Sequence, residues 1–150
     1  MSGGSEYTGM MDERRYFFIV GTARSGTTLL QSIVSCAPGV FMPPETHFMA
    51  LVYDHRRRLG DITTDAGWRA AIKLIHDRNG KAGIKLDPAR FEALAEEGPR
   101  NYATLLTAWL RAAAEFATAP GDPEPVILGE KSPGHLYHTL ELLAMLPDSR

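Results

Sequence analysis

The chain has 150 residues, of which 44% are hydrophobic and 23% charged, and its formal net charge at pH 7 is −2. These totals are typical of one ordinary globular domain, and the small net charge excludes a general attraction to nucleic acid or to anionic membranes. The single cysteine, Cys36, excludes an internal disulfide framework. We expect it to pack as a small core residue in a cytoplasmic protein. No run approaches the ~18 apolar residues of a membrane span, so none is predicted.

The first predicted elements form a strand, a turn and a helix. Residues 1–13 have the composition of a disordered leader. The apolar run from Tyr16 to Val20 predicts a buried strand, and the small-residue turn from Gly21 to Gly26 leads into a helix that ends at Pro38-Gly39. Because the first N–H groups of a helix have no internal partners, this segment predicts a site for phosphate or a related anion. A purely structural turn is the alternative. The predicted apolar face of the helix consists of Leu30, Ile33, Val34 and Ala37.

The middle of the chain is predicted to be mainly helical. After a possible short strand at 40–42, helical spacing runs from Phe48 into three arginines, 56–58, which we interpret as a solvated helix end. Further helices are predicted from Asp65, from Asp87 and over 101–118. We expect the first of these to be closed by Asn79-Gly80 and the aromatic stripe of the last to pack in the core.

The end of the chain returns to a strand and a helix. Val126 to Leu128 form an apolar run, and Pro133 falls near the first turn of a final helix. Alternating strands and helices predict an α/β fold with a parallel sheet covered by helices. Since such a sheet needs more strands than these segments supply, we expect residues 14–150 to be the N-terminal part of one domain, incomplete in this chain.

The turn differs from the nucleotide-binding loop G-x-x-x-x-G-K-[ST] at one important position. Thr27 stands where that loop has lysine, and a cation occurs instead inside the turn, at Arg24. The nearest candidate for a magnesium carboxylate is Glu130. A nucleoside triphosphate needs both the lysine and the metal, so the turn suits a less charged group and no metal is expected. A divergent P-loop kinase or NTPase is the alternative.

Three stretches in this order resemble sulfotransferases that use 3′-phosphoadenosine 5′-phosphosulfate, in particular the Golgi-type and related bacterial enzymes. Arg24 to Leu29, RSGTTL, resembles their 5′-phosphosulfate loop. Pro44-Glu45-Thr46 lies where these enzymes often have an acidic base, and Gly129 to Pro133, GEKSP, resembles their E-K-[ST]-P element. The resemblance covers residues 16–50 and 126–150 and implies a P-loop-like three-layer fold.

The resemblance also implies roles for individual residues. Glu45 would be the base that takes a proton from a hydroxyl or amine acceptor, while Lys131 and Arg24 would act on the reacting group and the departing 3′,5′-bisphosphate. His47 would face the acceptor or serve as an alternative base. The 5′-phosphosulfate would be held by Arg24, Ser25, Gly26, Thr27 and Thr28.

Each of these roles has a structural alternative. Glu45 could be a carboxylate in the first turn of a helix, and His47 an ordinary exposed histidine. Lys131 could form a surface salt bridge with Glu130 or Glu141.

The resemblance leaves the acceptor and the second half of the donor site undefined. The family's R-D-P-R-like turn, which binds the 3′-phosphate, would follow Arg150 and is not in this sequence. A non-catalytic anion-binding fragment is therefore a further alternative. The acceptor would be a small molecule, a carbohydrate or a lipid, bound by residues 45–118. Neither its identity nor the oligomeric state can be read from the sequence.

Overall fold

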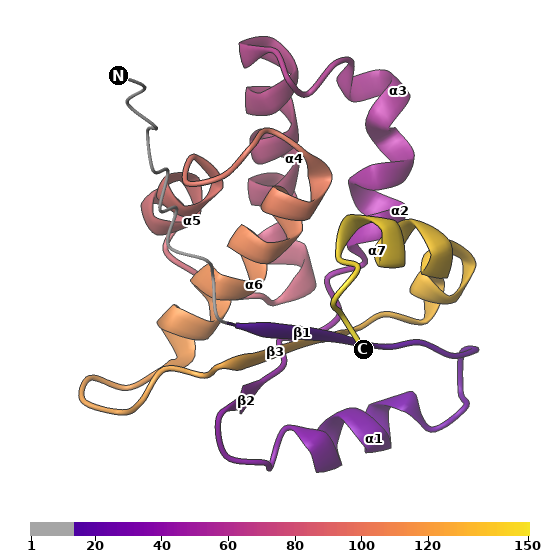
Figure 1. The fold of residues 1–150 in the computed structure, drawn as a ribbon, viewed down its shortest axis with the longest axis vertical. Coiled ribbons are helices and arrows are strands. Elements are labelled where there is room, and N and C mark those ends of the chain that lie inside the picture. Colours follow the sequence, from indigo (N-terminus) through magenta and orange to yellow (C-terminus); the bar gives the residue numbers. More distant parts are fainter. Residues whose placement is uncertain (1–13) are drawn as a thin grey trace, which may run out of the picture.

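Three parallel strands form the centre of the part of the chain that the structure describes. The structure, a computed structural model, describes residues 14–150, so the predicted leader at 1–13 lies outside the described residues. The strands lie side by side in the order β1-β3-β2 (Figure 1). Their bounds are β1 (Arg15–Ile19), β2 (Val40–Phe41) and β3 (Ile127–Lys131).

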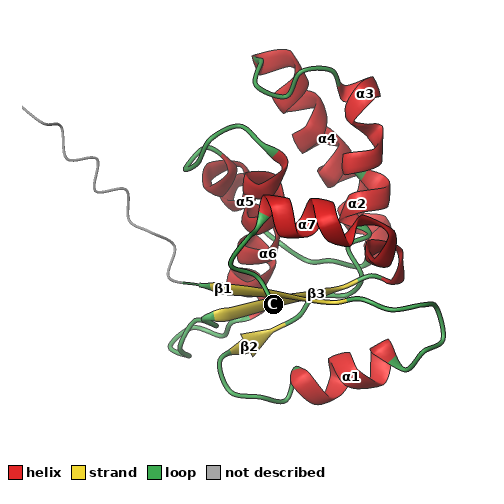
Figure 2. Cartoon of the chain, turned by 45° about the vertical axis from the view of Figure 1, so that its right-hand side comes forward, coloured by secondary structure: helices red, strands yellow, loops and turns green. Residues whose placement is uncertain are grey.

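Helices cover both faces of this sheet. Figure 2 shows α1 on one face and the remaining helices on the other, which confirms the predicted α/β fold with a parallel sheet between helical layers. The helices are α1 (Thr27–Val34), α2 (Phe48–Leu51), α3 (Arg56–Leu59), α4 (Asp65–Ala82), α5 (Pro88–Ala95), α6 (Tyr102–Ala117) and α7 (Thr139–Met145), with 3₁₀ turns η1 (Tyr53–His55) and η2 (Pro133–His138).

The strand register brings distant segments to one edge of the sheet. Ile19, at the end of β1, pairs with Lys131, at the end of β3, and Phe41 of β2 pairs with Leu128. Because the strands are parallel, the chain leaves all three at the same edge. The turn after β1, the segment after β2 and the segment after β3 therefore lie close together, although up to about 110 residues separate them along the chain.

Several predicted boundaries are wrong, for identifiable reasons. The last strand continues past Leu128 to Lys131, because Glu130 and Lys131 are buried by partners that lie far away in the sequence. Helix α4 does not stop at Asn79-Gly80 but runs on to Gly83, whose φ of 68° ends it. The final helix begins as the 3₁₀ turn η2.

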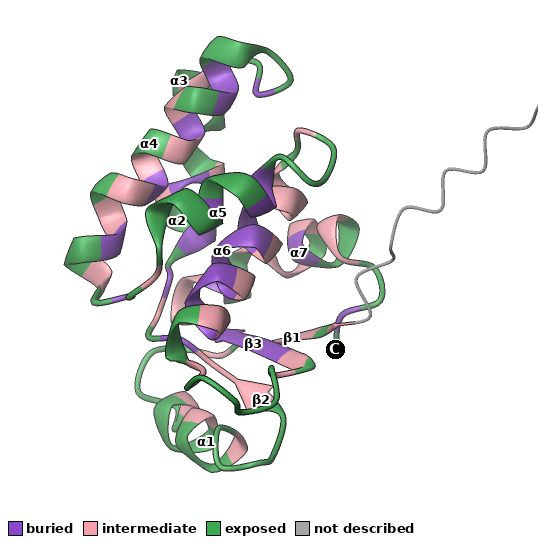
Figure 3. Cartoon of the chain, turned by 90° about the vertical axis from the view of Figure 1, so that its left-hand side faces the viewer, coloured by how far each residue is buried: buried purple, intermediate pink, exposed green. Residues whose placement is uncertain are grey.

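Helix α6 forms the centre of the core. Its aromatic and aliphatic stripe packs inward as predicted, with Leu105, Leu106 and Trp109 fully buried, while Phe116 at its end is exposed. The ring centroids of Trp109 and Phe48 are 6.2 Å apart, which ties α6 to α2. Figure 3 shows this buried layer above the sheet.

Helix α1 differs from its predicted packing. None of its residues is buried, and Leu30 and Ile33 remain 47% and 61% exposed. Cys36, which we expected in the core, is also exposed. The reason is geometric: α1 faces a narrow sheet to which β2 contributes only two residues (Figure 2).

Candidate active site

The turn after β1 leaves the start of α1 uncapped by side chains. Gly26 is the N-cap residue, with a left-handed φ of 87°, and no side chain accepts a hydrogen bond from the first turn. The turn also contains no acidic residue, and Arg24 lies exposed in it with a φ of 63°. The Ser25 hydroxyl donates to the carbonyl of Thr22 at 2.6 Å, which folds the turn back on itself. The free N–H groups and the guanidinium can therefore bind an anion.

Lys131 connects three of the predicted motifs. Its side chain is only 2% exposed, and its ammonium forms an ion pair with Glu45 and donates to the Thr28 hydroxyl at 3.2 Å. The predicted alternative of a surface salt bridge with Glu130 or Glu141 is therefore wrong. Glu45 lies in the segment after β2, outside any helix, so its alternative as a helix first-turn carboxylate is wrong too.

His47 completes this cluster on the solvent side. Its Nε2 lies 3.2 Å from Oε2 of Glu45, and the two side chains are 46% and 32% exposed. One Glu45 oxygen thus contacts a buried ammonium and the other an accessible imidazole. The cluster therefore combines a fixed carboxylate with access for a second molecule.

A second carboxylate, Glu130, lies completely buried beside this cluster, and its role was missed in the sequence. Its Oε1 accepts hydrogen bonds from the Thr46 amide at 2.9 Å, the Thr46 hydroxyl at 2.8 Å and the Ser132 hydroxyl at 2.6 Å. Its Oε2 lies 2.6 Å from Nδ1 of His135. Burial raises the pKa of Glu130, but the interactions with His135, Ser132 and Thr46 outweigh burial and hold the pKa below its ordinary value of 4.5.

These contacts decide against Glu130 as a magnesium ligand, because Oε1 accepts three hydrogen bonds and Oε2 lies against the His135 ring. His135 and His138, which are three residues apart, go to different carboxylates: His138 lies 3.3 Å from Asp54. A polar Glu-Lys-Ser run directly after an apolar strand is the one feature of the sequence that could have indicated a buried network.

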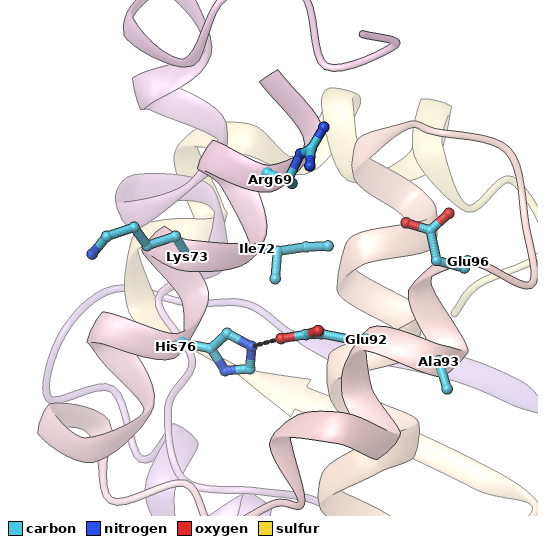
Figure 4. Close-up of a pocket in the computed structure, with 7 residues that line it drawn as sticks. All are labelled: Arg69, Ile72, Lys73, His76, Glu92, Ala93 and Glu96. Atoms are coloured by element: carbon cyan, nitrogen blue, oxygen red, sulfur yellow. Dashed lines mark hydrogen bonds and ion pairs between the residues drawn. The ribbon is translucent and has the colours of Figure 1, made fainter. Parts of the chain in front are cut away.

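One hollow of the surface lies away from these groups. It has a volume of about 510 Å³ and lies between α4 and α5, where His76 Nε2 and Glu92 Oε1 are 2.9 Å apart (Figure 4). None of its lining residues belongs to the turn, to the Glu45 cluster or to the Glu130 network. We therefore place the candidate site at the edge of the sheet, and not in this hollow.

The fold is that of an α/β protein of the P-loop-like class, with a glycine-bounded turn between its first strand and α1. A family model described as the sulfotransferase family matches residues 17–150, and the chain belongs to this family of transferases of sulfur-containing groups. The predicted membership of a sulfotransferase family is thereby confirmed. No curated protein and no solved structure matches the chain. Within residues 14–150, no helix has the length and apolar character needed to cross a membrane.

Proposed function

We propose that this protein transfers a sulfuryl group from 3′-phosphoadenosine 5′-phosphosulfate to a hydroxyl or amine of a small-molecule, carbohydrate or lipid acceptor. The observation that carries the proposal is the contact of the Lys131 ammonium with both Glu45 and Thr28, beside the uncapped start of α1. Membership of the family supports sulfuryl transfer in general. The free thiol of Cys36 is compatible with a reducing compartment, which supports the cytoplasm as the location.

The turn would bind the anionic end of the donor, which supplies the activated sulfuryl group. The N–H groups at the start of α1, the guanidinium of Arg24 and the hydroxyls of Thr27 and Thr28 are the available donors. The Ser25 hydroxyl would join them by giving up its hydrogen bond to the Thr22 carbonyl. Gly26 lets the chain adopt the left-handed conformation that directs those N–H groups into the turn. A sulfuryl group carries one negative charge fewer than a phosphoryl group, so these donors can neutralise it without a metal ion.

Glu45 would act as the general base. A neutral hydroxyl is a poor nucleophile, and a carboxylate that removes its proton contributes about 10²–10⁴-fold to the rate. Glu45 is accessible enough to reach an acceptor, and its contact with Lys131 fixes its position. Lys131 places a positive charge beside the turn, where it can stabilise negative charge that develops during transfer. His47 lies on the accessible side of Glu45 and would contact the acceptor.

The direct test is Glu45→Gln in the full chain. We expect kcat to fall at least about 100-fold while the Kd for 3′,5′-ADP changes less than about threefold, because the variant loses a proton acceptor and keeps the anion-binding turn. Glu141→Gln, which changes a 41%-exposed carboxylate on α7, is the matched control and should remain active. Full activity of Glu45→Gln would refute the assignment of the base. If His47→Asn is then inactive, the base is His47.

Ligand binding separates the remaining alternatives. We expect 3′,5′-ADP to raise the melting temperature of the chain more than ATP with Mg²⁺ or plain sulfate does. Equal affinity for sulfate and for the nucleotide would favour the non-catalytic anion-binding fragment. Magnesium-dependent ATP turnover that is lost in Arg24→Ala would favour the divergent kinase.

A further inference from the structure

Glu130 and Lys131 are neighbours in β3 but serve opposite faces of the sheet. Side chains alternate along a strand, so the Lys131 ammonium reaches Thr28 of α1, while the Glu130 carboxylate reaches His135 of η2. We propose that Glu130 is a positioning residue: it clamps the segment 45–47 to the end of β3 and thereby holds Glu45 against Lys131. This inference rests on the proposed function of Glu45.

The clamp holds two successive backbone amides. The amide of Thr46 donates to Oε1 of Glu130 at 2.9 Å, and the amide of His47 donates to the Ser132 hydroxyl at 2.9 Å. That hydroxyl in turn donates to the same Oε1 at 2.6 Å. These contacts join segments 84 and 85 residues apart in the sequence. Glu45 directly precedes Thr46, so these hydrogen bonds also fix the position of Glu45.

The other oxygen of Glu130 extends the clamp to α2. His135 is 1% exposed, its Nδ1 lies 2.6 Å from Oε2 of Glu130, and its Nε2 accepts a hydrogen bond from the amide of Met49 at 3.4 Å. Because Nε2 accepts, the ring proton belongs on Nδ1, the ring nitrogen that lies next to the carboxylate. The groups that contact the Glu130 carboxylate can therefore all act as donors, which suits a side chain that only accepts.

The backbone at His47 shows what the clamp has to hold. Its φ is 52°, a left-handed conformation that residues with a side chain adopt rarely, and it persists only where surrounding contacts impose it. Ser132 and Glu130 accept hydrogen bonds from the backbone of this segment, in addition to the contact of Lys131 with the Glu45 side chain. If they are lost, Glu45 is free to shift, and a displacement of about 1 Å at a reacting group can reduce a rate 10²-fold.

Hydrogen exchange in the full chain tests the clamp without requiring activity. Glu130→Gln replaces one carboxylate oxygen, which accepts hydrogen bonds, by an N–H₂ group, which donates them, at a place surrounded by other donors. We therefore expect the amide hydrogens of Thr46 and His47 to exchange at least about tenfold faster than in the wild type. The amides of α6 should keep their protection, and Glu141→Gln should change neither region. Unchanged exchange at Thr46 and His47 would overturn the proposal. Faster exchange throughout α6 would overturn it as well, because it would show a general loss of stability.

Two further variants test the clamp: Ser132→Ala covers the case in which Glu130→Gln does not fold, and a double variant applies where it does. Ser132→Ala removes the acceptor of the His47 amide and one of the donors to Oε1 of Glu130, while the Thr46 amide keeps its acceptor. We therefore expect exchange to become faster at His47 than at Thr46. His135→Asn, added to Glu130→Gln, offers a carbonyl to the new amide group and should restore part of the protection at Thr46. Ordinary exchange at His47 in Ser132→Ala, or no recovery in the double variant, would refute the clamp.

Activity gives the second readout and separates the two proposals. We expect Glu130→Gln to lower kcat about 10–100-fold with little change in the KM for the donor. If no variant and no wild-type chain transfers a sulfuryl group, the proposed function fails while the exchange result still stands. If Glu130→Gln transfers at the wild-type rate despite faster exchange, the clamp does not position the base.

Discussion

The two partners of the ion pair between Lys131 and Glu45 differ in exposure, so removing one or the other should lower the free energy of unfolding by different amounts. Lys131 is 2% exposed and Glu45 is 32% exposed. Removal of one partner costs ~3–5 kcal/mol for fully buried pairs and ~0–1 kcal/mol for exposed pairs, because a charge left behind in the interior cannot regain its hydration. Glu45→Gln leaves a buried ammonium, so we expect a loss of about 2 kcal/mol in the free energy of unfolding.

Lys131→Met leaves the Glu45 carboxylate, the more accessible of the two charges, and should lower the free energy of unfolding by less than Glu45→Gln does. The carboxylate of Glu45 can be rehydrated, so we expect a loss of about 1 kcal/mol, and the double variant should resemble Lys131→Met. The two changes are then strongly non-additive, with a coupling of about 2 kcal/mol.

Urea unfolding at pH 7 of the wild type, both single variants and the double variant measures this coupling. The matched control is the exposed pair of Lys73 and Asp77 on α4, whose side chains are 74% and 59% exposed at a distance of 2.8 Å. Lys73→Met and Asp77→Asn should show a coupling of no more than about 0.5 kcal/mol. The reasoning is refuted if Lys131→Met costs as much as Glu45→Gln, or if the two effects simply add.

Two further predictions concern stability. A β-carbon on Gly129 would lie 2.2 Å from Cζ of Phe17, so Gly129→Ala should lower the free energy of unfolding, measured with urea, by about 1–3 kcal/mol. The control is Gly134→Ala, where a β-carbon meets open space and the free energy of unfolding should change by less than about 0.5 kcal/mol. The folded pKa of Glu130 lies below its ordinary value of 4.5, so its stabilising contribution is present above about pH 4.5 and is lost as the pH falls through the folded pKa. The melting temperature of Glu130→Gln should therefore fall less on acidification than that of the wild type; an equal fall would contradict the assignment.

Much of the fold could be predicted because local patterns carry it. The apolar run in β1, the helix opened by Asp87-Pro88 and the stripe of α6 all appear where the sequence indicates. The predicted ends of elements are wrong where the burial of a residue depends on partners that are distant in the sequence. Glu130 and Lys131 extend β3 because other segments satisfy their charges, and no local pattern contains that information.

The sequence by itself determined the strand–turn–helix and the three motifs of the family, because each depends on neighbouring residues. Only the tertiary structure decided which of the charged groups meet. Parallel pairing of β1 with β3 placed Lys131 beside the turn, and alternation along β3 sent Glu130 to the opposite face. The partner of Lys131 is therefore Glu45, 86 residues away, and not the adjacent Glu130.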